Sequence, residues 1–562
     1  IIHSKMIASL LALLVLCYTL TVAASSPSVT LPNGVTLTGR KEKGADVYQG
    51  IPFAEPPLNE LRFQGPTPYI YSDDLDTMKP KSICPQLKIT KRINLGSEDC
   101  LYLNVYLPPG VDGADESVPV LFWIFGGGYV AGDGWEFTMY QGQKLAKATN
   151  SIVVAANYRV NAFGFLAAEN YSTGNMGIQD QRMALKWVQS NIKAFNGDPS
   201  RVTIFGQSAG AMSVCHHYAN GEASEGLFHA ALMESGNCNT PEFFFKQEEA
   251  FEFGVEYSKI IGCDVTSADY KECMGKLTTA EVMVGIEALL EEIPTSLDEF
   301  YLATNSSFVP PLSPIMPFGP VIDGTTDGTP RMPYEGITGG KAMNVPLMIG
   351  STSNEGSIFV PMLGEIVDGL KFPISNDDVK LAIHHILDPI IGADAVDADY
   401  DGLMDQYPIK DYNDPRAQLS KILRDYMFLC PSRRAARAAS ENGNEVFLYQ
   451  FDFHPYTWPD FDALGDYHGA EIYFIWDTPG PGMELVHPFF HDERRMVEIM
   501  QYYVGNLAKV GDVNKGDMPG DVPVWPVFTT GGDQHIVLKE TPQAGVGLNK
   551  DVCDYHDKML GY

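Results

Sequence analysis

The feature that most constrains the fold is a series of short apolar runs separated by a helical pattern. The runs at 118–125, 151–157 and 201–206 are rich in Val, Ile and Phe, which predicts strands buried on both faces of a sheet. Residues 177–195 place apolar side chains near helical spacing between the second and third runs. Strand, helix and strand in this order predict a crossover between parallel strands, and therefore an α/β fold. Runs of the same kind occur at 229–236, 345–350 and 446–451.

Composition indicates a large globular protein; length alone would suggest more than one domain, but large α/β enzymes often extend a single sheet with insertions. The chain has 562 residues, 45% hydrophobic and 20% charged, which is enough apolar material for a large core. The stretches 285–320 and 360–435 are less regular, and we expect helical insertions over the sheet there. No interdomain linker is evident, so we expect a single domain from residue 25 to residue 562.

The charge balance argues against two classes of partner. The chain has 39 Lys and Arg against 71 Asp and Glu, a formal net charge of −32. Such a charge disfavours nucleic acid and anionic membranes as partners. An acidic, solubilising surface is the favoured interpretation, and attraction of cationic ligands is the alternative.

The N-terminal segment predicts export. Residues 1–24 have a basic start, an apolar run and small residues up to Ala24, which is typical of a signal peptide with translation starting at Met6. A signal anchor is the alternative. We expect a secreted protein with glycosylation sequons at Asn170 and Asn305.

The cysteine count is compatible with disulfide bonds. Nine cysteines less Cys17, which is lost with the signal peptide, leave eight in an exported protein. An even number fits disulfides in that environment, but the count alone leaves the pairing open.

The stretch "FGQSAGAMS" (205–213) follows one of the predicted strands. Gly206 and Gly210 permit a turn too tight for larger side chains, which would expose the Ser208 hydroxyl and leave the Ala209 N–H at a helix N-terminus. A chance turn containing serine is the alternative. The strand–helix–strand context favours a nucleophile elbow.

A glycine run follows another predicted strand. In "GGGYVAG" (126–132) a backbone without side chains can approach a substrate closely. The N–H groups of Gly127 and Gly128, with that of Ala209, would form a three-donor oxyanion hole. A simple tight turn is the alternative.

Several longer segments resemble one protein family. They are "SEDCLYLNVYLP" (97–108), "FGGGYVAGDG" (125–134), "NYRVNAFGFL" (157–166), residues 174–213, "STSNEGSIF" (351–359) and "DYHGAEIYFIW" (466–476). In this order they resemble the type-B carboxylesterase family, which includes carboxylesterases, cholinesterases and several lipases. The resemblance extends from about residue 28 onward and implies the α/β-hydrolase fold, a large, mostly parallel sheet with helices on both faces.

The resemblance also implies a catalytic triad. Glu355 matches the family's acid and His468 its base, in the chain order Ser208, Glu355, His468 that α/β-hydrolases use. Neutral histidine accepts the serine proton near pH 7, while the carboxylate fixes its tautomer.

Other titratable residues compete with these assignments. His216 and His217 follow the serine on its own predicted helix and should point away from the elbow mouth, and His454 lies in a Pro-, Trp- and Asp-rich stretch. None is favoured as the base. Glu471 follows the histidine, and we expect a supporting or structural role for it.

Two departures from the family pattern bear on the substrate. Gln207 stands where the family usually has glutamate, which removes a negative charge beside the serine. The loop 85–99 contains no aromatic residue, so the cation–π anchor of cholinesterases is missing. Its shortness also favours soluble esters over a lidded lipase. The acyl pocket is expected around Met316 and Phe318.

The resemblance implies three disulfides: Cys84–Cys100, Cys263–Cys273 and Cys430–Cys553. Cys215 lies two helical turns after the serine, and we expect it to pack as a small, unbonded hydrophobe. A Cys215–Cys238 pair is the alternative.

These observations predict a secreted serine hydrolase of small-molecule carboxylic esters, with no cofactor, no metal, no nucleic-acid partner and no stable membrane insertion. A lipase acting on longer acyl chains is one alternative. A catalytically silent adhesion relative is another, disfavoured because the predicted triad is complete.

Overall fold

The structure is a computed structural model. It describes residues 26–87, 94–111, 114–135, 139–236, 238–239, 243–292, 316–364, 367, 369–455, 464–479, 489–516 and 522–562. The predicted signal peptide (1–24) and the sequon at Asn305 lie outside these residues.

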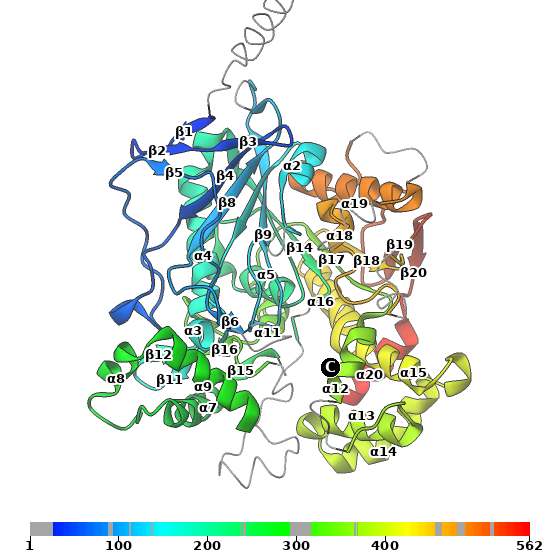
Figure 1. Cartoon of the computed structure of the whole chain (residues 1–562). Helices are drawn as coiled ribbons and strands as arrows, with labels where there is room; N and C mark the ends of the chain where they lie inside the picture. The colour runs from blue at the N-terminus through cyan, green and yellow to red at the C-terminus, as the bar shows by residue number, and fades with distance from the viewer. Residues whose placement is uncertain are drawn as a thin grey trace, which may run out of the picture.

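The described residues form an 11-stranded sheet in the order β20-β19-β18-β17-β14-β13-β9-β10-β8-β4-β3 (Figure 1). Its parallel strands are β9 (Val118–Ile124), β10 (Ile152–Ala156), β13 (Gly197–Gln207), β14 (Ala230–Glu234), β17 (Leu347–Thr352), β18 (Val446–Phe451) and β19 (Gln534–Leu538). Antiparallel strands complete both edges: β3 (Arg40–Glu42), β4 (Ala45–Pro52), β8 (Tyr102–Leu107) and β20 (Gln543–Val546). This arrangement confirms the predicted α/β class.

The smaller strands lie outside this sheet. They are β1 (Ser28–Thr30), β2 (Thr36–Thr38), β5 (Leu75–Asp76), β6 (Gln86–Leu87), β7 (Asn94–Leu95), β11 (Ala167–Ala168), β12 (Ser172–Thr173), β15 (Phe245–Lys246) and β16 (Val321–Ile322).

The sheet is flanked by helices. They are α2 (Gln143–Thr149), α3 (Asn161–Phe165), α4 (Met176–Asn191), α5 (Ala209–Ala219), α6 (Gly221–Ser224), α7 (Gln247–Ile260), α8 (Tyr270–Lys276), α9 (Thr279–Glu292), α11 (Pro333–Thr338), α12 (Phe359–Leu363), α13 (Asn376–Ile391), α14 (Ala393–Gln406), α15 (Pro415–Arg424), α16 (Cys430–Glu441), α18 (Ile472–Trp476), α19 (His491–Val510) and α20 (Lys550–Leu560).

The predicted crossover is present. Strand β9 lies between β10 and β13, and α4 connects β10 to β13. Strand β13 begins earlier than predicted because the chain rejoins the sheet at Gly197, opposite Val118, before a register shift. Asn196 ends the preceding helical turn with φ 61°, in the left-handed region that asparagine tolerates.

The core beneath the central strands is aromatic. Trp123 of β9 lies 4.8 Å from the rings of both Tyr140 and Phe205, and 5.3 Å from that of Trp476. These rings are buried, and such packing adds to the stabilisation from burial alone. A rigid core here fixes the ends of β9 and β13, where the two predicted glycine turns begin.

Two groups of helices lie beyond the lower end of the sheet in Figure 1, α7–α9 on one side and α12–α15 on the other. The group α12–α15 occupies the predicted insertion 360–435. The group α7–α9 lies mostly before the predicted insertion 285–320, which only the end of α9 enters, and residues 293–315 lie outside the described residues.

The described residues form four disulfides. Cys84–Cys100, Cys263–Cys273 and Cys430–Cys553 are the pairs that the resemblance implies. The expectation of an unbonded Cys215 is wrong, because Cys215 bonds Cys238. Cys215 lies in α5 and Cys238 lies shortly after β14, so this disulfide joins the helix after the elbow to the segment after that strand.

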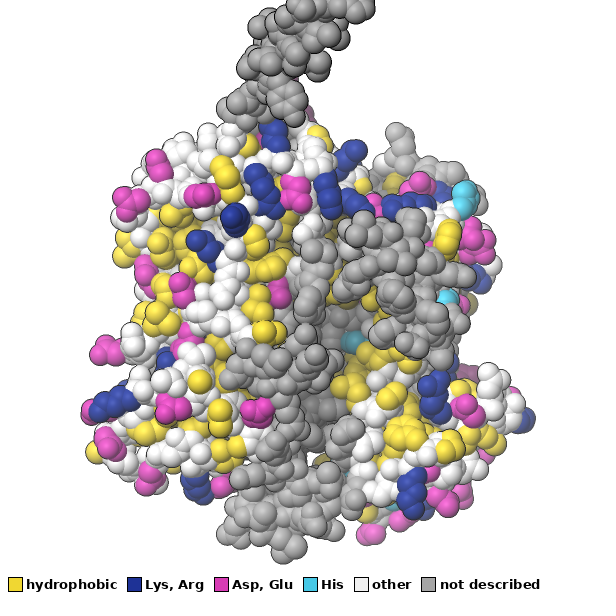
Figure 2. Space-filling model, in the orientation of Figure 1, with side chains coloured by type: hydrophobic (Ala, Val, Ile, Leu, Met, Phe, Trp, Pro, Cys, Tyr) yellow, Lys and Arg dark blue, Asp and Glu magenta, His cyan; other side chains and the backbone are white. Residues whose placement is uncertain are grey.

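The surface agrees with an acidic globular protein. Acidic, basic and hydrophobic side chains are interspersed over the face shown in Figure 2. Asn170 is exposed, with φ 58°, and is accessible for modification. Among the described residues, no helix combines the length and apolar character that crossing a bilayer requires.

Candidate active site

The elbow serine lies where β13 meets α5. Ser208 has φ 57° and ψ −128°, a strained conformation for a residue with a side chain. A Cβ added at Gly206 would lie 2.6 Å from Ile124 O, and one at Gly210 would lie 2.1 Å from the same atom. Because neither contact is tolerable, both positions require glycine. The resulting turn leaves Ser208 partly exposed, with its N–H donating to Glu234 O at 2.9 Å.

The glycine loop after β9 lies against this elbow. A Cβ at Gly126 would be 2.6 Å from Gln207 O and 3.0 Å from Ser208 Cβ. Gly127 and Gly128 have φ values of 105° and 62°, which favour glycine. Within the described residues their N–H groups donate to no backbone carbonyl. They therefore remain available to a developing negative charge.

Ala209 supplies a further donor beside the serine. It is the first residue of α5, so its N–H has no partner within the helix and lies at the positive end of the helix dipole. The structure thus brings the three predicted oxyanion donors to the same turn region.

Glu355 and His468 are directly bonded. Glu355 begins a 3-10 turn just after β17 and is fully buried, and its Oε2 lies 2.6 Å from His468 Nδ1. Its other oxygen accepts the Thr352 N–H at 2.7 Å. A carboxylate at this position favours the imidazole tautomer with hydrogen on Nδ1, which leaves Nε2 able to accept a proton.

The two loops that hold this pair are bound to each other. Ser353 N–H donates to Asp466 Oδ2 at 3.0 Å, and Asn354 Nδ2 donates to Leu464 O at 2.6 Å. Burial raises the pKa of Asp466. The distance between Glu355 and His468 is therefore fixed by hydrogen bonds between side chains and backbone of the two loops as well as by their own hydrogen bond.

The second nitrogen of His468 contacts the residue next to the serine. His468 Nε2 lies 3.2 Å from Gln207 Nε2, so the Gln207 amide donates to the imidazole lone pair. Among the described residues, no hydrogen bond joins Ser208 Oγ to His468. The ring packs against Phe359 and Phe428, with centroids 5.0 and 4.8 Å away. The imidazole of His468 thus lies at the elbow but is hydrogen-bonded to Gln207 instead of to Ser208.

Two further carboxyl groups are buried behind the pair. Glu471 accepts from Ser235 Oγ at 2.8 Å, and burial, with the nearby charge of Glu355, raises its pKa to about 8. Burial and Glu471 raise the pKa of Glu234 as well. Burial therefore favours the uncharged forms of Glu471 and Glu234.

The competing histidines lie elsewhere. His216 and His217 are buried in α5, where their Nε2 atoms contact Gly328 O at 3.2 Å and Gln181 Oε1 at 2.9 Å. His454 is exposed. None of the three is paired with Glu355.

The two residues predicted to line the acyl pocket, Met316 and Phe318, lie in different surroundings. A Cβ added at Gly128 would lie 3.1 Å from Met316 Cγ, so Met316 lies beside the glycine loop. Phe318 is buried and packs against Phe253 and Tyr257 instead.

Sequence reasoning missed two residues beside the site. Ser235 donates from Oγ to Glu471, and Glu234 O accepts the Ser208 N–H. One signal was available: a glutamate inside the apolar run 229–236 is unusual for a strand buried on both faces. Among the described residues, no group of three or more His, Cys, Asp or Glu side chains is arranged to hold a metal ion.

The sequence is similar to known proteins over nearly its whole length. The profile of the carboxylesterase family matches residues 25–556. Acetylcholinesterase of Electrophorus electricus is 30% identical, with 96% of this chain and 90% of that protein covered. Acetylcholinesterase of Bungarus fasciatus is 31% identical, with 91% of this chain and 82% of that protein covered.

Solved structures give the same result. A PNB esterase matches with a TM-score of 0.74 and 27% identity, covering 95% of this chain and all of that one. A thermophilic PNB esterase matches with the same TM-score and coverage at 26% identity.

Proposed function

Because this chain belongs to the carboxylesterase family and is a carboxylic ester hydrolase, we propose that it cleaves esters through an acyl-enzyme formed on Ser208. Ser208 Oγ attacks the ester carbonyl carbon while its proton passes to His468 Nε2. The carbonyl oxygen becomes an oxyanion that accepts hydrogen bonds from Gly127, Gly128 and Ala209. Glu355 stabilises the resulting imidazolium.

The tetrahedral intermediate then collapses to the acyl-enzyme, and hydrolysis of the acyl-enzyme follows. The imidazolium returns its proton to the leaving alkoxide, and the alcohol departs. Water then attacks the acyl carbon while its proton passes to His468 Nε2, and the carboxylic acid leaves as Ser208 regains its proton.

The observation that most supports this proposal is the 2.6 Å contact between Glu355 and His468 near a partly exposed elbow serine. The buried carboxylate makes Nε2 the basic nitrogen, and that atom lies 3.2 Å from the side chain adjacent to Ser208.

For the substrate we propose small esters with an uncharged alcohol group. The loop between Cys84 and Cys100 has no aromatic residue to hold a quaternary ammonium group. The acetylcholinesterase relatives suggest a choline ester as the alternative substrate. A kcat/KM for acetylthiocholine well above that for an uncharged acetate ester would contradict the assignment to uncharged esters.

We also propose that the protein is secreted. Support comes from the signal-peptide pattern of residues 1–24, from four disulfides and from the exposed sequon at Asn170. Recovery of the protein from culture medium without residues 1–24 and with a glycan on Asn170 would support secretion.

A lipase acting on longer acyl chains is the alternative to an esterase of small esters. Comparison of p-nitrophenyl acetate, butyrate and palmitate as substrates distinguishes the two activities.

The nucleophile is tested with a fluorophosphonate probe. We expect the adduct on Ser208, and we expect Ser208→Ala to abolish both labelling and turnover. Ser190→Ala is the matched control, because Ser190 is an exposed helical serine on α4 that bonds Lys186 O. Near-normal turnover by Ser208→Ala would reject the mechanism, and an inert wild-type protein would favour a non-catalytic relative.

A further inference from the structure

The loop closed by Cys84–Cys100 contacts the glycine loop through one buried side chain. Gln86 is only 6% exposed and lies in β6, two residues after Cys84. Its Nε2 donates to Gly132 O at 2.9 Å, and its Oε1 accepts from Gly132 N–H at 2.8 Å. The same Nε2 donates to Cys84 O at 3.1 Å. The side-chain amide therefore pairs with Gly132 as a neighbouring strand would.

Gly132 is the closing residue of the loop that holds the oxyanion donors. A Cβ at Gly132 would lie 2.7 Å from Gly126 O, so the two ends of the loop are in contact. Within the loop, Gly127 O accepts the N–H groups of Val130 and Ala131 at 3.1 and 3.2 Å. Because the loop is bonded to itself in this way, a displacement of Gly132 would be transmitted to Gly127 and Gly128.

Two asparagines connect the same pair of segments. Asn161 donates from Nδ2 to Pro85 O at 2.8 Å and from its backbone N–H to Tyr129 O at 2.6 Å. Asn157 accepts the Gly134 N–H at 3.0 Å and donates to Cys100 O at 3.0 Å. Both asparagines are buried. The disulfide loop and the glycine loop are thus joined at several points.

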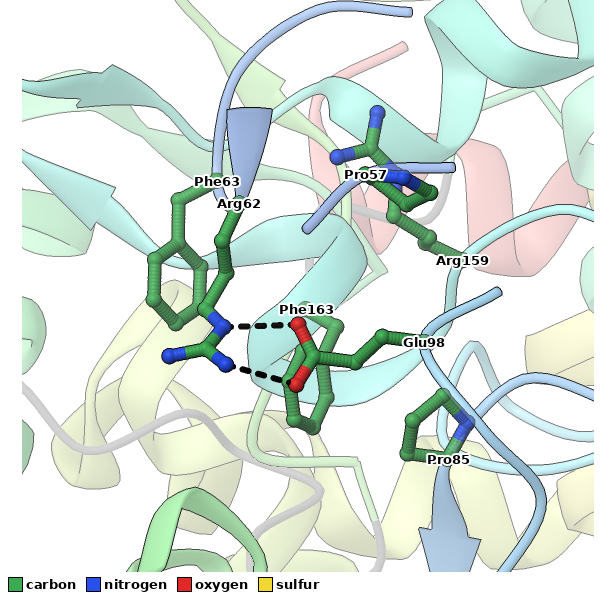
Figure 3. Close-up of a pocket in the computed structure, with 7 residues that line it drawn as sticks. All are labelled: Pro57, Arg62, Phe63, Pro85, Glu98, Arg159 and Phe163. Atoms are coloured by element: carbon green, nitrogen blue, oxygen red, sulfur yellow. Dashed lines mark hydrogen bonds and ion pairs between the residues drawn. The ribbon is translucent and has the colours of Figure 1, made fainter. Parts of the chain in front are cut away.

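The described residues at the two ends of the disulfide loop are anchored. Besides the Cys84–Cys100 bond, Glu98 forms a two-point ion pair with Arg62 at 2.6 and 2.8 Å. Figure 3 shows the two side chains facing each other, with Pro85 and Phe163 nearby. Both partners are buried, and a bidentate pair of this kind fixes orientation as well as distance. Gln86 therefore extends from a rigid base.

We propose that Gln86 is a positioning residue for catalysis: it holds Gly132, and through it the Gly127 and Gly128 donors, in the geometry that the oxyanion requires. The inference rests on the proposed serine-hydrolase function. Oxyanion donors contribute to the rate only when they lie at hydrogen-bonding distance from the developing charge. Loss of the Gln86 contacts should weaken transition-state stabilisation more than ground-state substrate binding.

The test compares Gln86→Met, which keeps side-chain length but removes all three hydrogen bonds, with the wild type. We expect kcat for p-nitrophenyl butyrate to fall by about 10- to 100-fold, with KM changed by less than about threefold. Gln189→Met is the matched control, because Gln189 also donates to two carbonyl oxygens, of Pro199 and Leu227, but lies in α4 away from the loop. Its kcat should stay within about twofold of the wild type.

A second readout separates positioning from general loosening. A trifluoromethyl ketone forms a hemiketal with the serine whose oxyanion occupies the hole, so its Ki should rise in proportion to the loss of kcat/KM. The Ki of a non-covalent competitive inhibitor should not change. A kcat loss without a change in the trifluoromethyl ketone Ki, or unchanged kcat, would overturn the proposal.

Folding and the proposed mechanism are checked separately. If Gln86→Met does not fold, Gln86→Glu retains the acceptor for Gly132 N–H and replaces it in the same assays. Failure of both to fold would make Gln86 a stability residue and reject the positioning role. An active Ser208→Ala variant would instead reject the proposed function, whereas an inactive Ser208→Ala with a fully active Gln86→Met rejects only this inference.

Discussion

Replacing Glu355 by glutamine should reverse the tautomer of His468. The Thr352 N–H, 2.7 Å from Glu355 Oε1, requires an acceptor on its side. A glutamine would satisfy it with its carbonyl oxygen, which turns its NH2 group toward His468 Nδ1. That nitrogen must then accept a hydrogen bond, so the imidazole hydrogen moves to Nε2, and Nε2 can no longer take the Ser208 proton.

The size of the effect follows from the geometry. The side chain is fully buried, so water cannot replace the lost carboxylate. An equivalent acid-to-amide change in a serine protease, which leaves the triad geometry intact, lowers kcat about 10⁴-fold. At about 1.4 kcal/mol per tenfold change, this corresponds to about 5.5 kcal/mol of transition-state stabilisation.

The assay is hydrolysis of p-nitrophenyl butyrate, with thermal unfolding as the check on folding. Glu335→Gln is the matched control, because Glu335 is an exposed residue of α11. The double variant Ser208→Ala/Glu355→Gln should be no slower than Ser208→Ala alone, since the residues act as a unit. A folded Glu355→Gln enzyme that retains kcat within about tenfold of the wild type would refute the tautomer argument.

Three further predictions follow from other parts of the structure. Gln207→Glu should move the acid limb of the kcat/KM–pH profile upward by about one unit or more, because a carboxylate 3.2 Å from the imidazole stabilises its charged form; an unchanged limb would place Gln207 away from the base in solution. Burial, with the nearby Arg182, lowers the pKa of His216 to about 3. As pH falls from about 6.5 toward 3, His216 is protonated in the unfolded chain but not in the folded one, so the free energy of unfolding should fall over that range. Urea unfolding checks this, because the free energy of unfolding of His216→Gln should depend less on pH between those values. Non-reducing peptide mapping should recover Cys215 joined to Cys238, and replacing both by alanine should lower the free energy of unfolding by about 3 kcal/mol; recovery of either as a free thiol would contradict the pairing.

The predictions of the strands and of the tight turn at Ser208 agree with the structure because they depend on local patterns. Buried strands such as β9 and β10 require continuous apolar runs, and the glycines around Ser208 are required by backbone contacts within one turn. Glu355 and His468 could not be found this way, since 113 residues separate them in the chain. Their assignment as a pair depended on the family resemblance.

The Cys215 expectation failed for a related reason. Its position on a helix after Ser208 was read correctly, but helical spacing says nothing about where the loop with Cys238 returns. Likewise, Met316 and Phe318 are two residues apart, and only their packing shows that one lies beside Gly128 and the other in the core.

The sequence by itself determined the order of strands and helices, the two glycine turns and the chemical class of the side chains available. Tertiary structure alone decided which of them meet: Glu355 with His468, Gln86 with Gly132, and Ser235 with Glu471. It also decided their charge states, because the pKa of Glu471 reaches about 8 only when burial removes water from a carboxyl group near Glu355. Periodicity and turn chemistry act over a few neighbouring residues, whereas hydrogen bonding and desolvation depend on segments that only the folded chain brings together.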